Sequence, residues 1–253
     1  CPHLRPARPR LHPLHLRHHP ELRDTILPAD QSAMRNLDLR EIDKWAASIG
    51  RKPGWRLDDQ DREGLRLDFL SNRPAGDLWV FGYGSLMWDP GILFAEVRQA
   101  EVFGYARSFC FWDDGARGSA AHPGLMLMLD QGRDCTGLAF RIDEAVIEQE
   151  TFVLFRREMI IGAYEPFWGT MEIQDEQVTG FAFRANHAHP WVRPGFSIAQ
   201  KARMIATASG LLGDNFSYLS ETRAKLLELG MADPYVDSVY EAVVTTRNEM
   251  GRQ

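Results

Sequence analysis

The sequence predicts an α+β fold in which strands come first and helices follow. From residue 78 to about residue 184, β-rich segments alternate with Gly, Pro, Asp or Asn turns, and one helical stretch interrupts them. After His189-Pro190 the hydrophobic periodicity becomes helical. A run of strands followed by a run of helices indicates α+β and not a doubly wound parallel sheet.

The N-terminal region is predicted to lie outside the compact domain. Residues 1–33 alternate Pro, Arg and His with no regular period, so we expect a disordered basic tail. Met34 is the first methionine and precedes a predicted helix over Leu37–Ile49, so we expect natural translation to start there. The rest of 34–77 is expected to be a charged connector, and a catalytic domain is expected over 78–250.

The elements of this domain follow from local patterns. A helix is predicted over Asp143–Ile161, because the segment has no Gly or Pro and begins with two acidic residues. Gly230 is expected to end a later helix as its C′ residue. The predicted strands are Leu78–Phe81, Ala100–Trp112, Leu125–Asp130, Cys135–Ile142, Tyr164–Ile173 and Val178–Arg184. The predicted late helices are Ile198–Ser209, Asn215–Leu229 and Pro234–Thr246.

Composition excludes several classes of protein. A net charge of −6 disfavours a general nucleic-acid or anionic-membrane binder. No segment approaches the roughly 18 apolar residues of a membrane span. The three cysteines Cys1, Cys110 and Cys135 form no C-x-x-C pair, which disfavours a zinc site and a disulfide framework. A cytoplasmic protein is therefore expected, and the sequence does not indicate its oligomeric state.

A glycine turn follows the first strand. In Gly82-Tyr83-Gly84-Ser85-Leu86 the two glycines allow a sharp bend with exposed N–H groups, which suits a carboxylate or phosphate. Met87 occupies the third glycine position of a dinucleotide fingerprint, so a Rossmann site is disfavoured. The turn also lacks the closing Gly of a nucleophile elbow, so Ser85 is expected to act through its backbone. By itself the turn is more often structural than functional.

One carboxylate falls on an apolar helix face. Helical spacing aligns Glu158 with Ile147, Thr151, Leu154 and Ile161. Partial desolvation would raise the pKa of Glu158 toward the range of a general base. The alternative is a structural ion pair with a neighbouring cation such as Arg157 or Arg156.

Several motifs together resemble the ChaC-type γ-glutamylcyclotransferase family. They are Trp79–Trp88, Gly104–Cys110, Arg117–Ser119, Pro123–Leu125, Gly137–Arg141, Arg156–Met159, Ala208–Gly210 with Leu212-Gly213, and Asn215–Leu219. The resemblance covers about 78–247 and implies a small mixed β-barrel with flanking helices. It also implies that Glu158 is catalytic, that Tyr83, Gly84, Ser85 and Leu86 bind the γ-glutamyl group, and that Tyr218 lies at the active site.

The implied reaction is the cleavage of glutathione to 5-oxoproline and cysteinylglycine without a metal or organic cofactor. The alternatives are a cyclotransferase for other γ-glutamyl amines or amino acids, and a non-catalytic γ-glutamyl-binding protein. Binding of nucleic acid through the basic tail is a weaker possibility.

The remaining polar residues leave open questions. Arg107 and Arg117 are each expected either to neutralise a substrate carboxylate or to form ion pairs at the barrel rim. His122, His187 and His189 are expected to be solvated loop residues. The tail histidines His3, His12, His15, His18 and His19 are expected to form no functional metal site, because a disordered tail supplies no fixed geometry.

Overall fold

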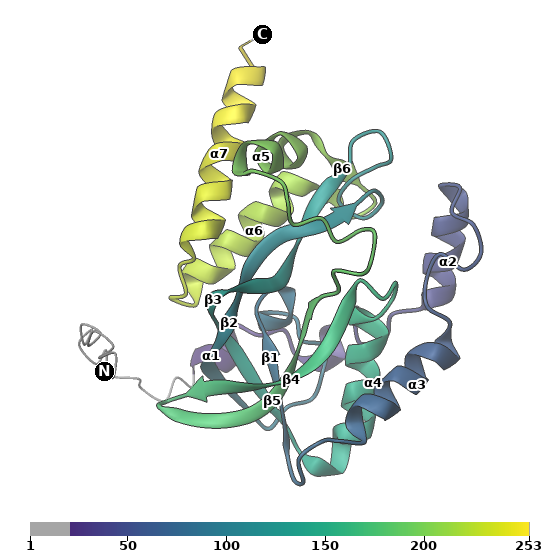
Figure 1. The fold of residues 1–253 in the computed structure, drawn as a ribbon, viewed down its shortest axis with the longest axis vertical. Coiled ribbons are helices and arrows are strands. Elements are labelled where there is room, and N and C mark those ends of the chain that lie inside the picture. Colours follow the sequence, from purple (N-terminus) through teal and green to yellow (C-terminus); the bar gives the residue numbers. More distant parts are fainter. Residues whose placement is uncertain (1–20, 253) are drawn as a thin grey trace, which may run out of the picture.

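The computed structural model describes residues 21–252 and contains a closed five-stranded mixed barrel (Figure 1). The strand order is β1-β3-β2-β4-β5, and the barrel closes through a parallel pairing of β1 with β5 at Val80 and Phe181. The other pairings are antiparallel. The strands are β1 Leu78–Gly82, β2 Glu96–Asp113, β3 Gly124–Ile142, β4 Tyr164–Ile173 and β5 Glu176–Ala185. The predicted α+β class with a mixed barrel is confirmed.

Strands β2 and β3 form a long ribbon that runs from the barrel toward the C-terminal helices (Figure 1). The prediction of two strands in the β3 region was wrong, because residues 131–134 continue the ladder instead of turning. The register shifts between Phe103 and Tyr105, where Gly104 has φ +85°. A glycine at this bulge relieves the steric cost of a left-handed backbone and lets the strand bend.

Helices α5, α6 and α7 pack together against the β2–β3 ribbon (Figure 1). They are α5 Ile198–Thr207, α6 Asn215–Glu228 and α7 Pro234–Met250, and a short hairpin of β6 Ser209–Gly210 and β7 Gly213–Asp214 joins the first two. Gly230 has φ +69°, and Met231 N–H donates to the Leu226 carbonyl at 2.8 Å. This is the glycine-ended helix terminus that the sequence predicts.

On the other side of the barrel, α4 Ile147–Glu158 lies beside α3 Asp59–Leu70 (Figure 1). The helix predicted over 143–161 is shorter at both ends, because η3 Glu144–Val146 precedes α4 and Met159 is its C-cap. Helix α3 was not predicted, since its segment is rich in charge and its apolar residue Phe69 is partly buried only by tertiary contacts with Phe155 of α4 and Trp168 of β4.

The N-terminal segment, residues 21–77, is folded onto the barrel, which differs from the predicted tail and connector. It contains α1 Glu21–Asp24, η1 Ala29–Gln31, α2 Leu39–Ser48 and α3. Ile26 and Leu70 belong to the same buried cluster as the barrel core. Disorder was therefore wrongly predicted for residues 21–33, whereas residues 1–20 lie outside the described part. The translation start at Met34 and the domain division stay predictions.

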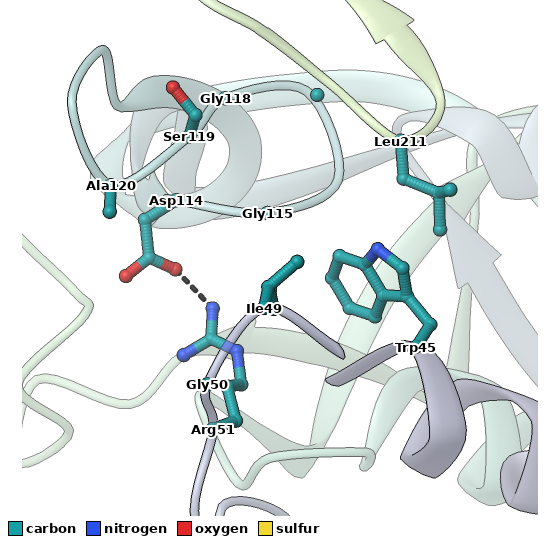
Figure 2. Close-up of a pocket in the computed structure, with 11 residues that line it drawn as sticks. Trp45, Ile49, Gly50, Arg51, Asp114, Gly115, Gly118, Ser119, Ala120 and Leu211 are labelled. Carbon is teal, nitrogen blue, oxygen red and sulfur yellow. Dashed lines mark hydrogen bonds and ion pairs between the residues drawn. The ribbon is translucent and has the colours of Figure 1, made fainter. Parts of the chain in front are cut away.

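The N-terminal segment also lines an open pocket of about 510 Å³ together with the loop that follows β2 (Figure 2). Trp45 and Arg51 line it from one side, and Asp114 and Leu211 line it from the other. Arg51 forms an ion pair with Asp114 and lies over the Trp191 ring, with its guanidinium carbon 4.4 Å from the ring centroid. Neither Glu158 nor Tyr83 lines this pocket.

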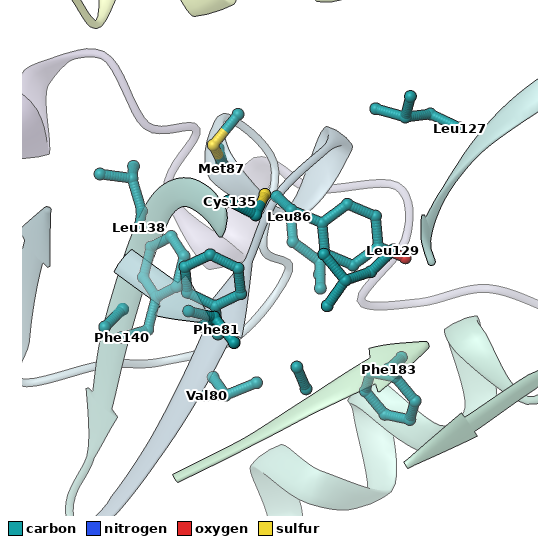
Figure 3. Packing of buried hydrophobic residues seen from close by; sticks show 14 of the residues in the cluster. Val80, Phe81, Leu86, Met87, Leu127, Leu129, Cys135, Leu138, Phe140 and Phe183 are labelled. Atoms are coloured by element: carbon teal, nitrogen blue, oxygen red, sulfur yellow. The ribbon is translucent and has the colours of Figure 1, made fainter. Parts of the chain in front are cut away.

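Large apolar side chains fill the barrel. Figure 3 shows Leu86 and Met87, which follow β1, packed with Phe81 and Phe140 of the paired strands β1 and β3. All four are almost fully buried. The turn after β1 is thus anchored in the core by its own residues, which gives it a fixed position. Within the described residues, no helix is both long enough and apolar enough to cross a membrane.

Candidate active site

The predicted substrate turn lies directly after β1. The strand ends at Gly82, and the short helix η2, Ser85–Met87, begins with Gly84 as its N-cap. Met87 N–H donates to the Gly84 carbonyl at 2.8 Å and closes the turn. The first N–H groups of a helix have no intrahelical acceptor, so η2 itself does not use those of Ser85 and Leu86.

Arg107 holds this turn in place. Its side chain is almost fully buried, and Nε donates to the Tyr83 carbonyl at 2.7 Å. The other nitrogens donate to the Thr136 carbonyl at 2.7 Å and to Asp233 at 3.0 Å. Because these partners occupy the guanidinium, Arg107 has the second of its two predicted roles: it is a structural ion-pair residue.

Glu158 ends α4 and lies close to the turn. Its side chain is 14% exposed, and Oε1 is 2.9 Å from Nε of Arg157. Burial raises the pKa of the Glu158 carboxyl, and Arg157 acts in the opposite direction without cancelling that effect. The two sequence hypotheses are therefore compatible, since the carboxylate is desolvated and ion-paired at once.

Three tyrosines surround this carboxylate. The hydroxyl of Tyr218 accepts from Leu127 N–H at 3.4 Å, and that of Tyr164 donates to the Leu127 carbonyl at 3.3 Å. Burial raises the pKa of Tyr218 to about 12, and it raises those of Tyr83 and Tyr164 well above their ordinary value. The charge of Glu158 adds to all three shifts. All three tyrosines are neutral at pH 7, and the hydroxyl proton of Tyr164 is donated to the Leu127 carbonyl.

Tyr164 is the site residue that sequence reasoning missed. It was assigned only as the first residue of a strand, and β4 does begin there. An aromatic residue at the start of a strand is ordinary, so no local signal distinguishes it. Its position beside Tyr218 and Glu158 results from barrel closure and from the docking of α6, which the sequence pattern does not show.

Arg117 differs from Arg107 in that its guanidinium lies over an aromatic ring and has no carboxylate partner among residues 21–252. Its guanidinium carbon lies 5.5 Å from the centroid of the Tyr218 ring. Its backbone N–H donates to Asp113, whose carboxylate also accepts from two other N–H groups of the same loop. Within the described part of the chain no carboxylate pairs with the Arg117 side chain. The loop therefore holds a cation beside Tyr218.

The histidines considered as possible metal ligands lie away from Glu158 and the substrate turn. His187 is half exposed, with Nε2 2.6 Å from Asp130, and His122 is exposed. His189 accepts a hydrogen bond at Nδ1 from Trp191 N–H at 3.2 Å. Among the described residues, no group of three His, Cys, Asp or Glu side chains is placed to hold a metal. The tail histidines lie outside the described residues.

The barrel with its flanking helices has the γ-glutamylcyclotransferase fold. The solved structure of a γ-glutamyl cyclotransferase specific to glutathione from yeast matches with a TM-score of 0.61. That match covers 69% of this chain and 98% of the other at 17% identity, so it shows a shared fold.

The chain belongs to the ChaC-like protein family, which matches residues 78–246. The glutathione-specific γ-glutamylcyclotransferase of Escherichia coli (strain K12) is 39% identical over 176 residues, which cover 69% of this chain and 76% of that protein. The glutathione-specific γ-glutamylcyclotransferase of Schizosaccharomyces pombe is 28% identical over 200 residues, covering 70% of this chain and 96% of that protein. The predicted family is confirmed.

Proposed function

We propose that this protein is a γ-glutamylcyclotransferase that converts glutathione to 5-oxoproline and cysteinylglycine. The observation that carries the proposal is the desolvated carboxylate of Glu158 beside the Tyr83–Leu86 turn, in a chain whose relatives bear this activity in their names. A protein that only bound γ-glutamyl groups would have no need of a base with a raised pKa.

The reaction is an intramolecular acyl transfer. The α-amine of the glutamyl group attacks its own γ-carbonyl carbon, a C–N bond forms in a five-membered ring, and the amide bond to cysteine then breaks. A tethered nucleophile that is well oriented can contribute roughly 7–11 kcal/mol toward the barrier. Glu158 takes the proton that the ammonium loses and delivers it to the departing amine. Such proton transfer contributes about 10²–10⁴-fold in rate.

The turn and the tyrosines have supporting roles in this proposal. The N–H groups of the Tyr83–Leu86 turn hold the glutamyl carboxylate or the oxyanion that develops on the γ-carbonyl. Tyr218 orients the substrate through its hydroxyl, which accepts from Leu127 N–H and keeps its own proton for a donated hydrogen bond. The hydroxyl of Tyr164 donates to the Leu127 carbonyl, so it can serve the same space as an acceptor. No residue in this scheme requires a metal or organic cofactor.

Arg117 is assigned to the far end of the substrate. Its guanidinium lies beside Tyr218 with no carboxylate partner in the described chain, so it is suited to the glycine carboxylate of glutathione. A charge-assisted hydrogen bond of about 1.5–3 kcal/mol predicts a roughly 10- to 100-fold rise in KM for Arg117→Met. The rise should disappear when the substrate carries a glycinamide terminus; an equal rise with both substrates would reject the assignment.

The central experiment measures release of 5-oxoproline and cysteinylglycine from glutathione by the purified protein and by Glu158→Gln. We expect about 10²–10⁴-fold slower release by the variant, with unchanged circular dichroism. Glu148→Gln is the matched control, since Glu148 lies on the same helix but is largely exposed. Full turnover by Glu158→Gln would disprove the role of Glu158. Inactivity of the wild type on glutathione, but not on other γ-glutamyl amines, would redirect the substrate assignment.

A cytoplasmic location is part of the proposal. Cys110 and Cys135 are both buried and unpaired, and burial raises their thiol pKa values to about 12 and about 11. Unpaired thiols fit a reducing compartment, which is where glutathione is held as the thiol. Fractionation of cells that express the protein with a C-terminal tag tests this; recovery in an oxidising compartment would contradict it.

A further inference from the structure

The guanidinium of Arg157 connects the two halves of the candidate site. Nε lies 2.9 Å from Oε1 of Glu158, and Nη2 donates to the Ser85 hydroxyl at 2.9 Å. Nη1 donates to the Asp89 carbonyl, just beyond η2. One planar group thus contacts the base, the substrate turn and the segment that follows the turn.

Burial makes this arrangement rigid. The Arg157 side chain is only 8% exposed, and each of its three nitrogens has a partner. A guanidinium has fixed fork geometry, so partners on its different edges are held at fixed separations. Flexible contacts at the surface would not do this, because solvent would compete for the donors.

We propose that Arg157 is a positioning residue that sets the distance and orientation between the substrate turn and the Glu158 carboxylate. The inference rests on the proposed function, because the distance matters only if the turn holds the γ-carbonyl while Glu158 moves the proton. It also assigns the Ser85 side chain: its hydroxyl supports the reaction as an acceptor for Arg157 and not as a nucleophile.

The ion pair leaves the base functional. Arg157 contacts Oε1, so Oε2 remains for the substrate amine. Arg157 lowers the pKa of Glu158 while burial raises it, so the cation limits how far the pKa rises. The other titratable groups near Glu158 are the hydroxyls of Tyr83, Tyr164 and Tyr218, which are neutral at pH 7.

The neighbouring arginine supplies a matched control. Arg156 is on the same helix, but its guanidinium donates to the backbone carbonyl of Arg35 and lies 5.5 Å from the Phe152 ring centroid. It does not contact Glu158 or the turn. Arg156→Met removes a half-buried cation next to Arg157 and should affect stability without affecting the pH dependence of turnover.

The test compares kcat, KM and the pH profile of kcat/KM for glutathione in the wild type, Arg157→Met, Arg157→Lys and Arg156→Met. For Arg157→Met we expect kcat to fall roughly 10- to 100-fold, because small misplacements of reacting groups are costly. The acid limb of its profile should move to higher pH, since the cation that favours the carboxylate is gone. Arg157→Lys keeps the charge but not the fork, so it should restore the acid limb and only part of kcat.

Ser85→Ala provides a second test of the proposal, and this test does not require Arg157→Met to fold. The loss of kcat in Ser85→Ala should be smaller than that in Arg157→Met. In the double variant Ser85→Ala/Arg157→Lys, the fold-loss of kcat should be smaller than the product of the two single fold-losses. The proposal would be overturned if the fold-loss of kcat in the double variant equalled the product of the single losses. It would also be overturned if the acid limb of the pH profile did not move in a folded Arg157→Met. An inactive wild type would instead refute the proposed function, so the two failures are distinguishable.

Discussion

The two ends of α4 each carry a partly or fully buried glutamate, and the two carboxylates differ in how many of their oxygens are already bonded. Near the N-terminal end, Glu150 is fully buried and accepts from both terminal nitrogens of Arg35, at 2.7 and 2.9 Å. Leu93 N–H donates to it as well, at 2.8 Å. Both oxygens are thus engaged in joining the N-terminal segment to the barrel.

At the C-terminal end, Glu158 has a single cationic partner, Arg157, on one oxygen. Its surroundings are tyrosine rings, and burial raises its pKa. The comparison teaches that burial alone does not make a carboxylate a candidate base. What distinguishes Glu158 from Glu150 is one carboxylate oxygen that Arg157 does not contact.

Replacing each glutamate with glutamine should produce the largest difference in turnover between two variants. Glu158→Gln should lower 5-oxoproline release by about 10²–10⁴-fold. Folded Glu150→Gln, assayed at low temperature, should keep turnover within a few-fold of the wild type, because Glu150 contacts neither the turn nor the tyrosines. A loss of turnover as large in Glu150→Gln as in Glu158→Gln, with the protein still folded, would remove the distinction.

The stability effects should have the reverse order. Glu150→Gln weakens a buried pair with Arg35 and should lower the free energy of unfolding by roughly 3 kcal/mol. Urea denaturation at neutral pH measures this directly. Glu228→Gln is the control, since it disrupts a partly exposed pair with Lys225 and should change stability by less than about 1 kcal/mol. Equal effects in the two variants would show that the Arg35–Glu150 pair does not anchor the N-terminal segment.

The smallest expected effect is a pH-dependent gain of stability in Glu158→Gln. Because burial raises the pKa of Glu158 in the folded state, the folded protein binds a proton more tightly than the unfolded chain. Stability therefore falls as the pH rises from the ordinary carboxyl range through the raised pKa, and Gln removes this penalty. The Tm of the variant should exceed that of the wild type above the raised pKa and converge with it at acidic pH. A difference that grew toward acidic pH would contradict the direction of the shift.

The sequence by itself determined the elements and the main candidates of the site. Local patterns predicted the strand Tyr164–Ile173 and a helix over 143–161, of which the structure forms Ile147–Glu158, because each pattern depends on side chains only a few residues apart. It also placed Glu158 on a buried face, together with Ile147 and Leu154. The motifs spread from Trp79 to Leu219 were sufficient to indicate the family.

Only the tertiary structure decided which long-range partners meet. It separated Arg107, which supports the turn, from Arg117, whose guanidinium has no carboxylate partner in the described chain, although the sequence treats the two alike. It brought Tyr164 into the site and folded residues 21–77 onto the barrel through Arg35. These contacts join residues far apart in the chain, and barrel closure with helix docking sets them. Local patterns record whether a side chain is buried, but not which side chain it meets.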